Sequence, residues 1–538
     1  MTINALFLFI TILAITGLGV DLMRFERNRS ILQYTVDRAV LAAADLDQTI
    51  PPQQVVEAYL DKAGLGEYLT GVDVQESIGY RKVTATAEME VPTHFVNFTG
   101  VRSFSAPAAS AAEESIGGVE ISLVLDVSGS MNSNNRLPRL KVAAKEFVDQ
   151  MIENSEDGKL SISIIPYASQ VSVPDSIFDQ LNVSTEHDYS NCVNFTSSQF
   201  SSRTLSPTDP LTRTMHFDPW YNYDARINAS PDILGEGTSS GSSLPVCEAR
   251  ESREILPLQK DATVLKNYIE GFIARGNTSL EIGMKWGTAL LDPSMRPVVS
   301  QLAANNEIPS VFGDRPGAYG TSETLKVIVL MTDGANTTQY YIPEGYRGDN
   351  STVWWNEQAK RYSTFDENNN RYYWDNATSE LDALSNWQDH AYGNGTYERC
   401  ISTNQWGNCT DTRETEETGT ATELSFGELW AYTSILSNYY TNFQPWMGSA
   451  ANYPWYYDIR KGIDAGVKNS RTQSICSAAK DAGVIVYTIG FEAPSGGVYQ
   501  LQNCASSDSH YYETEPGVSI SDVFASIASS IRKLRLTQ

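Results

Sequence analysis

The feature that most constrains the fold is a repeated order of buried strands and amphipathic helices that begins near residue 118. Three strands are apolar along almost their whole length, namely VEISLVLD, LKVIVLMT and GVIVYTIGF, and segments with helical spacing of apolar residues separate them. Continuous apolar strands that alternate with helices are typical of a mostly parallel sheet covered by helices on both faces. We therefore predict an α/β domain of this kind over residues 118–538.

Two long segments interrupt this order, at about residues 174–258 and 338–465. Both are rich in Asn, Ser, Thr, Tyr, Trp and Gly and poor in aliphatic residues. They are too long to be structureless loops inside a compact domain, so we predict insertions that decorate the surface. The aromatic and polar mixture of the second insertion, for example VWWNEQ and ANYPWYYD, fits either a binding surface or a small separate core.

The N-terminal part of the chain has a different character. Residues 1–20 contain an uncharged apolar run, residues 3–20, which is long enough to predict a transmembrane segment. A cleaved signal peptide is the alternative, but neither a basic region before the run nor a clear small-residue cleavage site after it is present. We predict an amphipathic helix over residues 21–50. A small α+β segment follows over residues 51–117 and ends in a small-residue linker, SAPAASAAEES.

Charge and cysteines give conflicting indications of the compartment. Arginines follow the apolar run at positions 24, 27 and 29 and no Lys or Arg precedes it, so a positive-inside count places the body of the protein in the cytoplasm. Six cysteines without a CxxC pair favour disulfides in an oxidising compartment, with reduced thiols as the alternative. Their order along the chain suggests three of the fifteen conceivable pairings, namely Cys192–Cys247, Cys400–Cys409 and Cys476–Cys504.

The net charge of −26 excludes whole classes of partner. Phosphate binding requires a basic face, so the balance argues against a nucleic-acid partner. The absence of CxxC and HExxH patterns, with only five His in the sequence, argues against a zinc site. Carboxylates in excess do suit hard divalent cations.

The first predicted strand ends in the turn DVSGSMNSNN. A phosphate loop needs GxxxxGK[ST] and a nucleophile elbow needs GxSxG with a His base, and neither pattern is present. Asp126, Ser128 and Ser130 instead place one carboxylate and two hydroxyl groups around a single turn, which suits an oxygen-coordinated cation. A helix cap gives the same DxSxS pattern and is the alternative for the motif alone.

Two downstream segments supply further oxygen ligands. GNTS places Thr278 just before a helix, and VLMTDG places Asp333 at the tip of a buried strand. Ligands of open α/β sheets gather at the carboxyl ends of the strands, so we expect these residues to meet the first turn. The predicted metal site therefore consists of Asp126, Ser128, Ser130, Thr278 and Asp333, with Mg²⁺ as the cation and Mn²⁺ or Ca²⁺ as alternatives.

In combination, DVSGSM, GNTS and MTDG resemble the metal-ion-dependent adhesion site of von Willebrand factor A domains, over residues 119–538 less the two insertions. The resemblance implies a Rossmann-like fold and a coordination position that a Glu or Asp of a protein partner completes. The whole chain also resembles the TadG type of Tad/Flp pilus-assembly proteins, through the helix NRSILQYTVDRAVLAAA and the ending ICSAAKDAGVIVYTIGF. Relatives usually carry a basic, Gly-containing stretch before the apolar run, which this sequence lacks.

This resemblance implies a non-enzymatic, single-pass protein of the bacterial inner membrane, with its large domain in the periplasm and pilus or envelope proteins as partners. A location at the cell surface or on the pilus is the alternative. Two other functions stay open: a phosphatase-like hydrolase with Asp126 as nucleophile, and a structural A domain with a vestigial metal site. The hydrolase would need a second acid where Ser128 stands.

Overall fold

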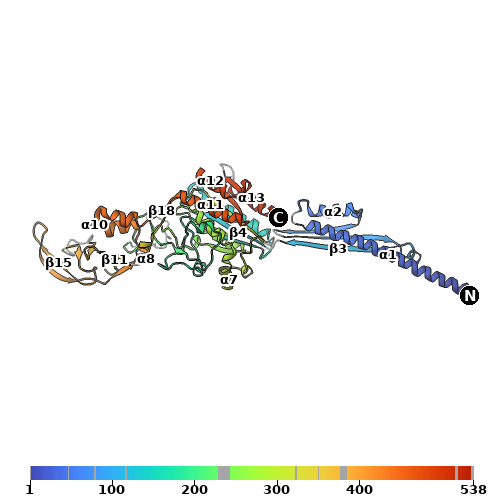
Figure 1. The fold of residues 1–538 in the computed structure, drawn as a ribbon, viewed down its shortest axis with the longest axis horizontal. Helices are drawn as coiled ribbons and strands as arrows, with labels where there is room; N and C mark the ends of the chain where they lie inside the picture. Colours follow the sequence, from blue (N-terminus) through green and yellow to red (C-terminus); the bar gives the residue numbers. More distant parts are fainter. Residues whose placement is uncertain are drawn as a thin grey trace.

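The computed structural model describes residues 2–45, 48–77, 80–115, 118–227, 243–320, 324–348, 350–375, 385–514 and 519–534. Figure 1 shows an elongated molecule with three parts in line. An N-terminal module of one long helix and a small sheet lies at one end, a central α/β domain in the middle, and a distal body built from the insertions at the other end.

The N-terminal module consists of a helix laid along an antiparallel sheet. α1 (Thr2–Ala44) is continuous through the predicted transmembrane segment and the helix after it, and α2 (Pro52–Lys62) packs beside it. The sheet has the order β1-β2-β3, with β1 at Leu69–Ser77 and β2 at Tyr80–Pro92. The second half of α1 buries one face against the sheet, while residues 3–16 are exposed along the first half.

The predicted small-residue linker is wrong, because SAPAASAAEES belongs to strand β3 (Ser103–Ser115). This strand pairs with β2 along its whole length. Ala106 and Ala108 point to the same side and are buried in the cluster under α1. Small side chains at alternate positions let the helix approach the sheet closely, and the alternation of a strand is hidden in the sequence when both faces carry Ala and Ser.

The central domain confirms the predicted mixed α/β fold. Its six-stranded sheet has the order β20-β19-β9-β4-β5-β8 and is parallel except for β8, which is antiparallel to β5. The strands are β4 (Gly118–Asp126), β5 (Leu160–Tyr167), β8 (Leu256–Gln259), β9 (Thr324–Thr332), β19 (Ile485–Phe491) and β20 (Tyr511–Thr514).

Helices cover both faces of this sheet, and each face has its own buried apolar cluster. One face carries α3 (Arg136–Glu153), α5 (Ala262–Glu270) and α13 (Ile520–Leu534). The opposite face carries α6 (Leu280–Ala289), α7 (Arg296–Ala304), α11 (Ala465–Asp481) and α12 (Ser495–Cys504). The three strands named from the sequence, β4, β9 and β19, are neighbours in this sheet and alternate with helices as expected, whereas β8 comes from a segment predicted as an insertion.

The first insertion is not a surface decoration as predicted. Its last residues form β8 of the central sheet. Phe195 packs edge-on against the buried Trp286 of the central core, and Phe200 packs edge-on against Phe195. Short elements mark this stretch: α4 (Asp175–Phe178), β6 (Val193–Asn194) and β7 (Thr212–Arg213). Scattered aromatic residues form the buried contacts of this stretch. The sequence does not reveal them because the stretch is poor in aliphatic residues.

Other described residues of the first insertion, Phe217 and Val246 among them, join the second insertion in the distal body, which has a separate apolar core. That core includes Phe217, Val246, Ile342, Trp355 and Trp430. Its five-stranded antiparallel sheet consists of β14 (Trp387–Gln388), β13 (Arg371–Trp374), β12 (Arg361–Asp366), β11 (Asn350–Asn356) and β17 (Ala421–Ser425). Around it lie β10 (Gln339–Tyr341), β18 (Lys461–Ile463), α8 (Phe426–Tyr432), α9 (Ile435–Ser437) and α10 (Gln444–Met447).

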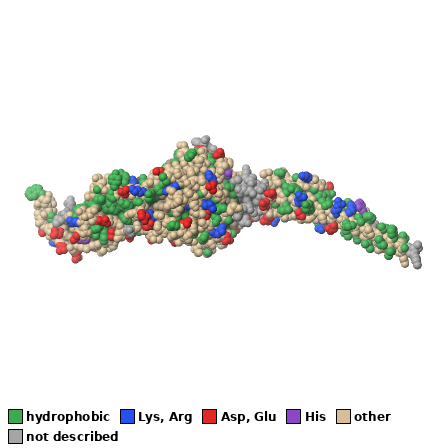
Figure 2. All heavy atoms as spheres, viewed as in Figure 1, with side chains coloured by type: hydrophobic (Ala, Val, Ile, Leu, Met, Phe, Trp, Pro, Cys, Tyr) green, Lys and Arg blue, Asp and Glu red, His purple; other side chains and the backbone are tan. Residues whose placement is uncertain are grey.

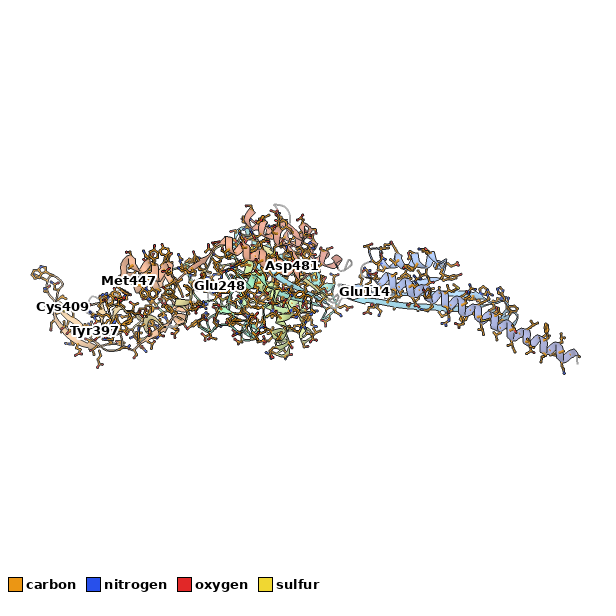
Figure 3. The ribbon with its side chains drawn as sticks, viewed as in Figure 1. Glu114, Glu248, Tyr397, Cys409, Met447 and Asp481 are labelled. Carbon is orange, nitrogen blue, oxygen red and sulfur yellow. A yellow bond between two sulfur atoms is a disulfide. The ribbon has the colours of Figure 1, made fainter. Side chains whose placement is uncertain are left out.

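All three predicted disulfides are formed in the structure. Cys192–Cys247 closes the first insertion, Cys476–Cys504 joins α11 to α12, and Cys400–Cys409 closes the hairpin β15 (Thr396–Thr403) and β16 (Cys409–Glu416). Figure 3 shows Cys409 near the distal tip, at the opposite end of the molecule from the start of α1. Disulfides are typical of proteins folded in an oxidising environment.

Candidate metal centre

The turn that follows β4 places its polar groups at the carboxyl edge of the central sheet. Asp126 is the last residue of the strand and is fully buried. One carboxylate oxygen, Oδ1, accepts the backbone N–H of Ser128 at 2.8 Å, which bends the chain back over the strand end. The Oγ atoms of Ser128 and Ser130 lie 3.0 Å apart.

The neighbouring strand β9 brings Asp333 to the same place. β4 and β9 are paired in parallel with Leu125 beside Met331, so their ends coincide. The hydroxyl of Ser130 donates to Asp333 Oδ1 at 2.6 Å, and the hydroxyl of Thr332 donates to Asp126 Oδ2 at 2.6 Å. Each of these two hydrogen bonds joins residues that lie more than 200 positions apart in the sequence.

Thr278 reaches this edge from the loop before α6. The loop is fixed to the first turn because Gly129 donates its backbone N–H to the carbonyl of Gly276 at 2.9 Å. A Cβ placed on Gly334 would lie 3.6 Å from Thr278 Oγ1 and 3.8 Å from Ser130 Oγ. These hydroxyl oxygens thus face a common space that the glycine leaves free. The structure brings all five predicted residues to one edge of the sheet.

Two arginines and a glutamate, which the sequence did not single out, also lie at this edge. Arg136 at the start of α3 donates to Asp333 Oδ2 at 2.8 Å and to Glu492 at 3.1 Å, and Arg139 pairs with Glu492 at 2.6 Å. Glu492 follows β19, another strand of the same sheet. Acidic residues therefore follow the ends of three neighbouring strands.

A buried lysine holds the Thr278 loop from behind. Lys468 on α11 donates to the carbonyl oxygen of Thr278 at 2.7 Å, to Ser279 Oγ at 2.7 Å and to the carbonyl of Thr337 at 2.8 Å. Its Nζ lies 3.8 Å from Glu281, and both side chains are fully buried. Burial lowers the pKa of Lys468 and raises the pKa of Glu281. No short motif marks this lysine in the sequence.

The electrostatics of the site suit a divalent cation. Burial, together with the negative charge of Asp333, raises the pKa of Asp126 to about 7. A bound cation would favour the ionised form and supply the positive charge that this pair of carboxylates lacks. Among the described residues no group of three or more His, Cys, Asp and Glu is placed to hold a metal. The donor set here is instead two carboxylates and three hydroxyl groups, the hard oxygen ligands of Mg²⁺.

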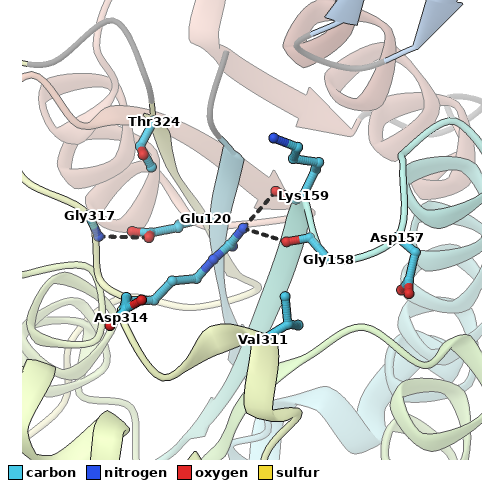
Figure 4. A pocket seen from close by; sticks show the side chains of 9 residues that line it. Glu120, Asp157, Gly158, Lys159, Val311, Asp314, Gly317 and Thr324 are labelled. Carbon is cyan, nitrogen blue, oxygen red and sulfur yellow. Dashed lines mark hydrogen bonds between the residues drawn. The ribbon is translucent and has the colours of Figure 1, made fainter. Parts of the chain in front are cut away.

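A hollow at the amino edge of the sheet has a different character. It has a volume of about 350 Å³ and is lined by Glu120, Lys159, Arg315 and Thr324, among others (Figure 4). Arg315 donates to the carbonyls of Val119, Gly158 and Lys159, and Glu120 pairs with Lys326 at 2.5 Å. Arg315 and Glu120 are therefore both engaged by other groups of the chain.

Comparison with known proteins gives a family match for the N-terminal segment. The chain is a mixed α/β protein with an N-terminal helix, α1, that is long and apolar enough to cross a membrane. Residues 1–46 match the family described as "Putative Flp pilus-assembly TadE/G-like". A search of curated proteins gives no match. The family match and the membrane-length helix together support a pilus-associated membrane protein.

Several solved structures show a distant similarity. The pilus adhesin SpaC from Lactobacillus rhamnosus GG is 12% identical, with a TM-score of 0.29, and the match covers 86% of this chain and 34% of SpaC. The vWF domain of the type V pili tip protein Mfa5 from Porphyromonas gingivalis is 13% identical, with a TM-score of 0.30 and coverage of 77% and 95%.

The adhesive tip pilin GBS104 from Group B Streptococcus agalactiae is 11% identical, with a TM-score of 0.32 and coverage of 78% and 100%. The chain thus spans about a third of the length of SpaC. TM-scores this low do not establish a common fold.

Proposed function

We propose that this chain is a membrane-anchored protein of Tad/Flp-type pilus assembly whose central domain, of the von Willebrand factor A type, binds a protein partner through a divalent cation. The observation that carries the proposal is the contact between Ser130 and Asp333, at 2.6 Å. It joins the DxSxS turn to the end of the neighbouring strand, and the Thr278 loop is fixed to the same turn. A helix cap alone needs no such convergence of three loops.

The cation would be held by Asp126, Ser128, Ser130, Thr278 and Asp333. Mg²⁺ keeps several coordination positions for water or for a second molecule, so a Glu or Asp of a partner can complete its shell. The chain's own residues contact both carboxylates: Thr332 and the backbone of Ser128 orient Asp126, whereas Arg136 pairs with Asp333 and competes with the cation for its Oδ2.

The role of Asp126 supports binding rather than hydrolysis. Both of its oxygens accept hydrogen bonds from the chain, and the residue has no exposed surface. A nucleophile must approach its substrate directly, and Ser128 supplies no carboxylic acid to protonate a leaving group. The large domain, on this proposal, stands in the periplasm, anchored in the inner membrane by α1, where its three disulfides can form.

The decisive experiment is calorimetric titration of the full chain in detergent with Mg²⁺ and with Mn²⁺. We expect one site in the wild type and none in Asp126→Ala. Asp157→Ala is the matched control, because this acid is exposed at the other edge of the sheet and pairs only with Lys260 among the described residues. The control should bind as the wild type does. Equal binding by wild type and Asp126→Ala would refute the metal site.

Partner binding is tested in the native cell. Cross-linking of the wild type should capture an envelope or pilus protein, and Asp126→Ala should lose that protein while Asp157→Ala keeps it. Pilus formation scored in the same cells then reports whether the metal site serves assembly. Capture that is equal in both variants would leave the cation without a role in the partner interaction.

A further inference from the structure

A continuous series of tyrosine rings covers part of the distal body, far along the molecule from α1. We call it the tyrosine ladder; its members are Tyr440, Tyr439, Tyr456, Tyr457 and Tyr453, in spatial order. Successive ring centroids lie 4.8, 5.7, 4.9 and 5.8 Å apart. Figure 2 shows side chains of the hydrophobic class, which includes tyrosine, gathered over the segment that carries α10.

The ladder presents large aromatic surfaces to solvent. Tyr440, Tyr453 and Tyr457 are 52%, 71% and 56% exposed, although aromatic side chains of this size are usually buried to a greater extent. The two remaining members are half-buried and connect the exposed rings to the distal core. Exposed aromatic surface that is contiguous, rather than scattered singly, is a feature of binding sites.

The support beneath the ladder is rigid. Phe443 and Trp455 stack face to face, with ring centroids 3.5 Å apart and planes 10° from parallel. The ladder residues lie on two π-helical turns, Asn438–Phe443 and Tyr453–Tyr457, and Tyr439 donates its hydroxyl to Asn452, which ties the two turns together. π-helical turns are rare and occur often at functional sites. Rings fixed in this way lose little conformational entropy when a ligand binds.

The chemistry of the segment indicates the charge of its ligand. Residues 438–457, NYYTNFQPWMGSAANYPWYY, contain no Asp, Glu, Lys or Arg, although charged residues make up 19% of the chain. Besides the aromatic rings, the segment offers Asn, Gln, Ser and Thr side chains as hydrogen-bonding groups. Arg460, just beyond the segment, lies over the Tyr456 ring at 4.2 Å and donates to the Tyr456 hydroxyl and to the carbonyl of Pro219, so its guanidinium is engaged within the chain. The segment itself offers a charged ligand no opposite charge, and a neutral ligand is the complementary choice.

We propose that the tyrosine ladder is a binding site for a neutral oligosaccharide. A pyranose ring has an apolar face of C–H groups that stacks on an aromatic ring, and a rim of hydroxyl groups that pairs with amides and phenols. Several rings in series suit several sugar units in series. The site goes beyond the metal-dependent function proposed above, because it uses none of the metal-site residues and needs no cation.

Two other occupants fit the observations less well. A lipid surface would require the ladder to lie near the membrane, but the distal body and the start of α1 lie at opposite ends of the molecule (Figure 1). The cores of protein–protein interfaces are enriched in Trp, Phe, Met and Arg as well as Tyr. Here each exposed ring ends in a hydroxyl group, and the polar side chains of the segment are amides and hydroxyls.

The experiment is a titration of the full chain in detergent with cellohexaose, chitohexaose, maltohexaose and mannohexaose, followed by saturation-transfer NMR and calorimetry. Polygalacturonate and chitosan oligomers are the anionic and cationic controls. We expect at least one neutral hexasaccharide to bind, with saturation transfer from tyrosine protons. Binding should persist with EDTA and in Asp126→Ala, which separates this site from the metal site.

Variants of the exposed rings complete the test. Tyr453→Ala and Tyr457→Ala should each weaken binding by about tenfold, because each removes one stacking surface. Tyr453→Phe keeps the ring and should weaken binding by less than about threefold. Tyr499→Ala is the matched control, since Tyr499 is 63% exposed on α12 of the central domain, and it should change nothing.

Thermal unfolding of each variant establishes that the distal body is intact. The proposal is overturned if no neutral hexasaccharide binds, if the tyrosine variants bind as the wild type does, or if the charged polymers bind equally well. Binding to phosphatidylcholine vesicles that depends on Tyr453 and Tyr457 would assign the ladder to a lipid surface instead.

Discussion

The two edges of the central sheet both bury charged groups, but only at the amino edge is each buried acid paired with a buried base. At the amino edge, Glu120 and Lys326 form an ion pair at 2.5 Å, with both side chains 3% exposed, and Arg315 is engaged by backbone carbonyls. At the carboxyl edge, Asp126 and Asp333 are both buried, and the one guanidinium on Asp333 is shared with Glu492.

This difference separates charges that serve the fold from charges that serve a ligand. A buried ion pair inside the chain needs nothing further, and it is disrupted only when one partner is removed. Two buried carboxylates that lack a full complement of positive charge are stabilised by a cation from outside. The same sheet thus has a closed edge, which needs no ligand, and an open edge, which is suited to one.

The largest effect is expected at the closed edge. Lys326→Met leaves Glu120 buried without its partner, which should lower the free energy of unfolding by about 3–5 kcal/mol. Urea unfolding measures this loss. The matched control is Lys260→Met, whose partner Asp157 is 83% exposed; it should cost less than about 1 kcal/mol. Comparable losses in the two variants would show that burial does not distinguish this ion pair.

The open edge should respond to the cation instead. Saturating Mg²⁺ at about 100 times its dissociation constant should raise the free energy of unfolding by about 2.7 kcal/mol, because it binds only the folded state. Asp126→Asn should abolish this increase, whereas Lys326→Met should retain it on a lower baseline. Urea unfolding with Mg²⁺ and with EDTA provides the measurement. An unchanged increase in Asp126→Asn would place the cation elsewhere.

The stability contributed by the open edge should also depend on pH. The pKa of Asp126 is about 7 in the folded protein, above its usual value of 3.8, so without metal the folded state binds more protons between these values. The resulting stability is present in full below pH 3.8 and is lost as the pH rises through 7, with a slope of up to about 1.4 kcal/mol per pH unit. Unfolding in EDTA from pH 5 to 8 should show this decline in the wild type and not in Asp126→Asn.

The smallest effect concerns Arg136, which occupies one oxygen of Asp333. Arg136→Met removes a positive charge beside the cation and should tighten Mg²⁺ binding by about fivefold, equivalent to about 1 kcal/mol. Arg139→Met is the control, because Arg139 pairs with Glu492 and stacks on Phe491 without contacting Asp333. Calorimetric titration of each variant with Mg²⁺ measures this change in affinity. Weaker binding in Arg136→Met would make this arginine a positioning residue that the site requires.

The sequence predicts the central sheet and the five site residues because both depend on local patterns. Buried parallel strands are continuous apolar runs, and each motif lies directly after such a strand or before a helix. The sequence does not reveal Lys468 or Glu492, whose contacts depend on how α11 and β19 pack beside the other loops. Whether the five residues bind a metal stays a prediction.

Weak or mixed patterns account for the errors. Strand β3 was hidden because Ala and Ser occupy both of its faces, and the distal core was hidden because aromatic residues replace the aliphatic ones that mark most cores. The insertions also cooperate across more than a hundred positions, with Phe217 and Trp430 in one cluster. Burial of this kind is decided by tertiary packing and leaves no period in the sequence.

The pairing of β3 has a mechanical consequence. A pull on the distal body would reach α1 through the end of β3 nearest the central domain, and α1 lies along the strands (Figure 1). The hydrogen bonds between β2 and β3 and the apolar contacts of α1 are then loaded together in shear, instead of opening one after another. Asp21 adds a further attachment nearer the start of α1, where its carboxylate accepts hydrogen bonds from the backbone N–H groups of His94, Phe95 and Val96. The module is therefore suited to resist a pull between the start of α1 and the central domain.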